Sequence, residues 1–204
     1  LVLFLLSLPG QYLFGVTTMS MAAVVTTYLF GLAYFAATGI YFFSDSYIPV
    51  SVFLGMHFLF TDPSTAPRTD LGRITFGVLY GLAAVALYAW LQRAGIPEFY
   101  DKLLQVPLMN LSIQLIDRAA RSERLRWLDP STLGRSLVGR RSNLAYMTVW
   151  AIGFAIMSAV QGGGDDHPGQ FLPFWQQACE KDRRYACSYL AGMQTNYCRQ
   201  GSGW

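Results

Sequence analysis

The sequence predicts an all-α protein: a polytopic transmembrane bundle of about five to six helices, the first one truncated, followed by a small exported helical hairpin. Hydrophobic residues make up 53% of the 204-residue chain and charged residues only 13%, whereas a soluble domain carries roughly 25% charged residues. No Asp, Glu, Lys, Arg or His occurs before Asp45, and ~20 apolar residues are enough to cross a bilayer. These observations exclude a soluble enzyme, a nucleic-acid-binding protein and a disordered chain.

Charge-free intervals give the expected helices in chain order. Residues 1–8 are the end of a helix that Pro9-Gly10 interrupts, and because the chain opens without an initiator Met we expect it to be a piece of a longer protein. Residues 12–43 exceed one crossing, so this span is tilted or includes interfacial turns. The further expected helices lie in the intervals 46–61, 74–92, 103–116 and 144–160.

The positive charges predict the orientation of the chain in the membrane. The segment 118–143 carries seven arginines and the loop 61–73 carries two, while the loop 93–102 carries one arginine and one lysine. Because Lys and Arg accumulate in cytoplasmic loops, 61–73 and 118–143 are expected in the cytoplasm. Alternation then places 44–47 and 93–102 outside, with 162–204 periplasmic or extracellular. The arginine segment is also suited to contact anionic lipid of the surrounding bilayer.

The exported part is expected to differ from the bundle. All three cysteines lie in it, which is typical of a disulfide-bearing domain on the oxidising side of the membrane. We therefore divide the chain into a transmembrane bundle at 1–161, a glycine-rich linker at 162–169 and a helical module at 170–204.

A turn with two prolines and several polar side chains follows the third span. Pro63 and Pro67 end the helix, and Thr61 or Asp62 can cap the backbone groups left open. Exposed donors at such a break can hold an anionic or polar ligand, although a capped interfacial turn without a ligand explains the same residues.

Few other polar residues lie at membrane depth. Asn110 must face protein or water, either in an interhelical hydrogen bond or at a ligand, so we expect it to face the bundle interior. Gly77 and Gly81 have the spacing that lets two membrane helices approach closely. His57 has no second histidine at membrane depth with which to hold haem, and His167 lies in the glycine linker, so no metal site is expected.

Several short motifs follow one another between about residues 46 and 118. They are Thr61-Asp62-Pro63, the following Thr65-Ala66-Pro67, then Gly72-Arg73, Phe76-Gly77, Leu108-Met109-Asn110 and Ile116-Asp117. In both order and spacing these motifs resemble the RnfD/NqrB family, whose members are membrane subunits of the Rnf electron-transport complex and of the sodium-translocating NADH:quinone reductase.

The resemblance implies a membrane subunit of an ion-coupled, flavin-dependent electron-transport complex that works with other membrane subunits and carries FMN or riboflavin. Such a chain is at most one part of the enzyme, and it has no assigned catalytic residue. The family's covalent flavin sits on a Thr in a Ser-Gly-Ala-Thr motif, which is absent here. The alternative is a non-enzymatic membrane scaffold of the same fold. The cofactor-binding candidates implied by the resemblance are Thr61, Asp62, Thr65, Arg73 and Asn110.

The tail resembles cysteine-rich TPR-like repeats of the Sel type, which implies an exported protein partner. Cys179 and Cys187 are expected to form a disulfide, with two buried free thiols as the alternative. On one continuous helix their Cα atoms would be ~12 Å apart, whereas a disulfide needs ~7 Å or less. The bond therefore requires a turn near Lys181-Asp182-Arg183. Cys198 is expected to pair beyond the end of this sequence.

Overall fold

The structure is a computed structural model, and it describes residues 2–59, 66–94, 101–122, 140–161, 167–183 and 185–192. This part of the chain is helical without strands, as the composition predicts. It forms two compact units: Leu1–Tyr28 with Ile48–Gln161, and Leu29–Tyr47 with Gly162–Trp204.

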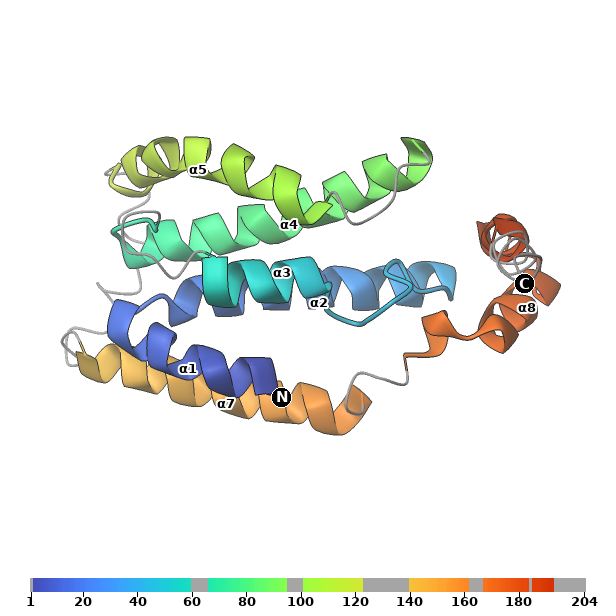
Figure 1. The fold of residues 1–204 in the computed structure, drawn as a ribbon, viewed down its shortest axis with the longest axis horizontal. Helices are drawn as coiled ribbons and strands as arrows, with labels where there is room; N and C mark the ends of the chain where they lie inside the picture. Colours follow the sequence, from blue (N-terminus) through green and yellow to red (C-terminus); the bar gives the residue numbers. More distant parts are fainter. Residues whose placement is uncertain are drawn as a thin grey trace, which may run out of the picture. The chain divides into compact units, whose positions relative to one another are not determined.

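Figure 1 shows the elements in chain order. They are α1 (Val2–Phe14), α2 (Thr17–Thr38), α3 (Val50–Leu54), the π-helical turn η1 (Gly55–Leu59), α4 (Asp70–Ala94), α5 (Asp101–Ala120), α7 (Arg140–Gln161), the 3-10 turn η4 (Pro168–Gln170) and α8 (Leu172–Glu180). Three described helices are long and apolar enough to cross a membrane, namely α2, α4 and residues 143–160 of α7.

The first helix runs through the proline that was expected to interrupt it. α1 continues past Pro9 and ends at Phe14, where Gly15 adopts a φ of +65°. A proline removes one backbone hydrogen bond, but membrane helices tolerate this loss where neighbouring groups satisfy the freed carbonyl. The expected interruption at Pro9-Gly10 is therefore wrong, and the glycine with positive φ ends the helix instead.

Close contact between α2 and α4 is possible because two glycines lie on α4. A Cβ at Gly77 would collide with the carbonyl oxygen of Met19 and lie 2.9 Å from the Cβ of Ala22. A Cβ at Gly81 would lie 3.0 Å from the carbonyl oxygen of Ala23. The predicted packing role of the glycine pair is confirmed.

The first unit has α4 near its centre and α7 at its periphery. Within this chain 44% of the α4 span is buried but only 6% of the α7 span, so most of α7 faces lipid or another chain. Figure 1 shows α5 alongside α4, and α1 alongside α7. The largest buried hydrophobic side chains of this core include Met19, Met56, Phe76, Tyr80 and Trp150.

The tail of the second unit packs on the loop after α2. The indole nitrogen of Trp175 donates to the carbonyl oxygen of Gly169 at 2.7 Å. The Nδ1 atom of His167 lies 3.1 Å from the carbonyl oxygen of Ser44, and the amide of Gln170 donates to the carbonyl oxygen of Asp45. Residues 44–47 and the tail therefore lie together within the second unit.

A disulfide closes a helical hairpin in the tail. α8 ends at Glu180, residues 181–183 form the turn, and a second helical segment covers 185–192. Cys179 and Cys187 are bonded with a Cα–Cα distance of 4.7 Å, which confirms the predicted pair. Trp175, Ala178 and Ala186 are buried together beside it. Cys198 lies outside the described residues.

The predicted orientation can be tested with single cysteines. In a Cys198→Ser background, Ser188→Cys on the tail should react with a membrane-impermeant maleimide in intact cells. Ser122→Cys at the end of α5 should react only after permeabilisation, because it belongs to the arginine-rich segment. Both serines are exposed in the structure, so accessibility of the side chain does not limit the reaction. The reverse labelling pattern would contradict the orientation.

Candidate functional site

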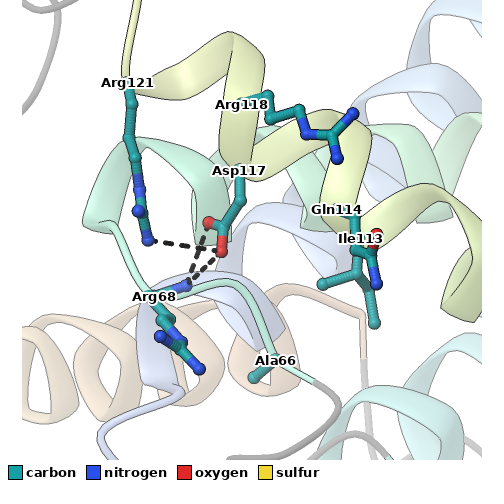
Figure 2. Close-up of a pocket in the computed structure, with 7 residues that line it drawn as sticks. All are labelled: Ala66, Arg68, Ile113, Gln114, Asp117, Arg118 and Arg121. Atoms are coloured by element: carbon teal, nitrogen blue, oxygen red, sulfur yellow. Dashed lines mark hydrogen bonds and ion pairs between the residues drawn. The ribbon is translucent and has the colours of Figure 1, made fainter.

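Two of the motif segments found in the sequence meet at one end of the first unit. The carboxylate of Asp117, at the end of α5, accepts hydrogen bonds from the backbone N–H of Arg68 at 3.1 and 3.4 Å. It also lies 3.8 Å from the guanidinium of Arg121. Figure 2 shows the carboxylate of Asp117 pointing at the loop before α4, described here over residues 66–69, and the side chain of Arg121 extending towards the same carboxylate. Asp117 thus holds the loop before α4 against α5.

Arg73 ties the same loop to the connection between α1 and α2. Its Nε donates to the carbonyl oxygen of Pro67 at 3.1 Å, and its Nη1 donates to the carbonyl oxygen of Gly15 at 2.8 Å. A carboxylate oxygen of Asp70 lies 3.5 Å from the same Nη1. Arg73 was a cofactor-binding candidate, and in this structure its guanidinium is already engaged with three protein groups.

A further polar bridge joins the start of α7 to this end of the unit. The Asn143 amide nitrogen donates to the carbonyl oxygen of Gln11 at 3.1 Å, and the hydroxyl of Thr17 donates to the amide oxygen of Asn143 at 3.1 Å. These bonds and those of Arg73 bring Gly15, the loop before α4 and the start of α7 to one end of the first unit. The bridge itself was not predicted from the sequence, because an asparagine at a helix start has no distinctive pattern.

Three other candidates, Thr61, Asp62 and Thr65, lie outside the described residues. Asn110 is exposed on α5 and makes no hydrogen bond with a described residue. The expectation that it faces the bundle interior is therefore wrong for this chain. Met109 and Ile116, seven residues apart, take the buried face of α5, which turns the neighbouring Asn110 outward. The buried polar residue on α5 is instead Gln105, whose amide nitrogen donates to the carbonyl oxygen of Tyr80.

An open cavity of about 400 Å³ lies between the loop before α4 and α5. The described residues that line it are polar or charged apart from Ala66 and Ile113, and none of them is aromatic. This lining suits an anionic group, but it offers no flat apolar wall for an isoalloxazine ring. The described residues therefore do not fit a flavin ring at this place. The residues around the cavity are Ala66, Arg68, Ile113, Gln114, Asp117, Arg118 and Arg121.

His57 forms a buried polar contact that the sequence pattern did not indicate. The indole N–H of Trp150 donates to its Nε2 at 3.3 Å, and its Nδ1 lies 2.8 Å from the carbonyl oxygen of Phe53. These partners require a neutral ring with the proton on Nδ1. The ring also stacks on Phe53 with a centroid distance of 4.2 Å. Because both nitrogens are engaged, His57 joins η1 to α7 and has a structural role.

His167 is likewise fixed by protein groups. Its Nδ1 lies 3.1 Å from both the backbone nitrogen of Gly169 and the carbonyl oxygen of Ser44, so one neutral tautomer accepts from Gly169 and the other donates to Ser44. The rings of Tyr41 and Tyr47 pack edge-on against it at 4.4 and 4.3 Å. Burial lowers the pKa of His167, so the neutral ring is favoured at pH 7. Burial and the Tyr47 hydroxyl raise the pKa of Tyr41 to about 12.

Comparison with known proteins adds one finding. A protein-family model described as the NQR2, RnfD, RnfE family matches residues 2–126. The match covers α1 to α5, including Gly15, Arg73 and Asp117, and it ends before α7 and the disulfide-bonded tail. No curated protein and no solved structure matches the chain.

Proposed function

The chain belongs to the NQR2, RnfD, RnfE family, and on that premise we propose that it is a membrane subunit of an ion-coupled, flavin-dependent electron-transport complex. The family is associated with flavin-binding electron-transport complexes of the Rnf and Nqr type. The three membrane-length helices among the described residues agree with a multi-pass subunit of such a complex. We place it in a bacterial inner membrane with the tail outside the cytoplasm.

The observation that carries this proposal is the joint position of the family-type motifs. Pro67, Arg73 and Asp117 come from separate motifs, yet all three lie in the hydrogen-bond network that links the loop before α4 with α1, α2 and α5. The network gives the loop a fixed geometry at one end of the bundle. The remaining candidates Thr61, Asp62 and Thr65 directly precede this loop in the chain.

The cofactor of the proposed function is FMN or riboflavin, which would supply one- and two-electron transfer when bound. The cavity beside Asp117 does not fit its ring, and the sequence contains no Ser-Gly-Ala-Thr motif for covalent attachment. The flavin would therefore be held by residues other than those described around this cavity. The role of the described residues is to position the loop that follows Thr65.

Flavin content of the full-length protein tests the proposal. In-gel fluorescence after denaturation detects covalent flavin, and fluorescence of the supernatant after acid release detects bound riboflavin or FMN. We expect flavin in one of the two fractions, close to one molecule per chain. Pure, correctly inserted protein without flavin in either fraction would contradict the proposal.

Substitution of Asp62 by alanine tests the loop directly. If the carboxylate helps to hold flavin or a partner subunit, Asp62→Ala should lower electron transfer by about tenfold or more, because small displacements of a redox centre have large effects on rate. The level of protein in the membrane should stay unchanged. Asp45→Asn, in the loop after α2, is the matched control and should retain full activity. Unchanged electron transfer in Asp62→Ala would leave Asp62 as a structural residue.

A second candidate function is a scaffold that displays the tail to an exported protein. The disulfide-bonded hairpin beside Trp175 favours this candidate, because such a small helical module has its own cross-link and its own buried cluster. The two proposals predict different effects of removing flavin. The function of a scaffold, binding of its exported partner, would be retained, whereas the function of a redox subunit, electron transfer, would be lost.

A further inference from the structure

The cavity between the loop before α4 and α5 carries an excess of positive charge. Among the described residues, three guanidinium groups and one carboxylate line it. That carboxylate, Asp117, already accepts from the backbone of Arg68 and pairs with Arg121. Within the described part of the chain, no carboxylate pairs with the guanidinium groups of Arg68 and Arg118. The cavity therefore presents two arginines that can receive an anion.

An apolar helix face leads away from this cavity. Leu111 and Leu115 on α5 are 84% and 70% exposed, and Arg118 follows them at positions i+7 and i+3. Residues at these spacings lie on one face of a helix. Because a span is predicted at 103–116, these leucines are expected to face acyl chains, and Arg118, one turn beyond Leu115, reaches the headgroup region. The same face thus changes from apolar to cationic at the end of the helix.

We propose that the cavity binds the phosphate group of an anionic phospholipid whose acyl chains lie along Leu111 and Leu115. Arg68 and Arg118 receive the phosphate, and the side chain of Gln114, which also lines the cavity, offers a hydrogen-bond donor to it. Charge complementarity explains the preference for an anionic headgroup over a zwitterionic one. The leucine face explains the preference for a lipid over free phosphate, because a soluble anion would gain nothing from it.

Such a lipid would join two segments that are far apart in sequence. Arg68 comes from the loop before α4 and Arg118 from the end of α5, and both segments are predicted to lie at the cytoplasmic surface. The bound headgroup would reinforce the hydrogen bonds that Asp117 makes with the loop. This role does not depend on flavin, so the proposal stands apart from the proposed electron-transport function.

Native mass spectrometry of the full-length protein in detergent tests the proposal. The probes are phosphatidylglycerol, phosphatidylcholine and inorganic phosphate, each titrated separately. We expect phosphatidylglycerol to bind at least tenfold more tightly than either of the others. Each of the substitutions Arg68→Gln and Arg118→Gln should weaken phosphatidylglycerol binding about fivefold, because one arginine near an anionic lipid surface raises the affinity by about this factor. Both side chains are exposed, so the variants should fold normally.

Two variants make the result specific. Arg93→Gln removes an exposed arginine from the other end of α4 and should leave phosphatidylglycerol binding unchanged. Arg118→Lys keeps the charge and should retain most of the affinity. Equal loss of phosphatidylglycerol binding in Arg93→Gln and Arg118→Gln would overturn the proposal, because binding would then depend on the overall positive charge of the protein and not on this cavity. Inorganic phosphate that binds as tightly as phosphatidylglycerol would overturn the assignment to a lipid.

Discussion

Replacing Gly77 by leucine should prevent the membrane bundle from forming its native packing. The nearest obstacle to a side chain at this position is the backbone carbonyl of Met19, which cannot rotate out of the way. The added side chain must therefore push α4 away from α2 along their whole contact. Overpacking of a core usually costs about 1–3 kcal/mol, and we expect about 3 kcal/mol or more here because backbone atoms are involved. The measurement is the yield of monodisperse protein and its thermal unfolding after detergent extraction.

The matched control is a glycine on a helix without a close neighbour. Gly153 on α7 has no described atom within 4 Å of an added Cβ, so Gly153→Ala should leave the unfolding temperature unchanged or raise it. Alanine is about 1 kcal/mol more favourable than glycine inside a helix. Gly81→Ala should fall between the two, since its Cβ would lie 3.0–3.2 Å from Ala23 and Thr26. Normal stability of Gly77→Leu would show that α2 and α4 do not pack as described.

Loss of the disulfide should unfold the tail hairpin without affecting the bundle. Cys179 and Cys187 are eight residues apart, and closing such a short loop contributes roughly 2–3 kcal/mol in the chain-entropy model. In Cys179→Ser or Cys187→Ser, amide protection over 172–192 should fall roughly 30- to 150-fold. Hydrogen exchange read by mass spectrometry measures this region and α4 in one experiment. The protection of α4 should not change, because the buried cluster beside the disulfide belongs to the second unit.

The third cysteine of the tail supplies the control for this experiment. Cys198→Ser leaves the disulfide intact and should show the exchange pattern of the unaltered protein. Treatment of the unaltered protein with a reductant should reproduce the effect of Cys179→Ser. Full protection of the hairpin after reduction would show that Trp175, Ala178 and Ala186 stabilise it without the cross-link.

The membrane bundle itself could be predicted from the sequence because the relevant signals are local. A charge-free interval longer than a bilayer crossing predicts a helix in lipid, and α4 and α7 cover the expected intervals 74–92 and 144–160. The expected span 12–43 is too long, because α1 extends to Phe14 and α2 occupies only Thr17–Thr38. The disulfide was implied by the resemblance of the tail to cysteine-rich repeats, and the charged turn at 181–183 makes the bond geometrically possible. The packing role of Gly77 and Gly81 followed from their spacing on one helix face. Each of these features depends on a few consecutive residues and on the geometry of a single helix.

Other features depend on contacts that no local pattern encodes. The end of α1 was misplaced because a proline is a weaker stop inside a membrane helix than a glycine with positive φ. Asn110 was assigned to the interior by its polarity, yet the burial of Met109 and Ile116 decides which face of α5 turns inward. Polarity alone does not reveal whether a residue faces its own chain, lipid or another subunit.

The sequence by itself determined the helical membrane class and the positions of the spans that became α4 and α7, because hydropathy acts within one segment. Only the tertiary structure decided that Asp117 holds the backbone of Arg68, which lies 49 residues away. It also decided that Trp150 fixes the proton of His57 on Nδ1, and that Arg73 joins two helix connections. These bonds arise where segments distant in sequence are brought together by packing, and a hydrogen bond needs both partners within about 3 Å.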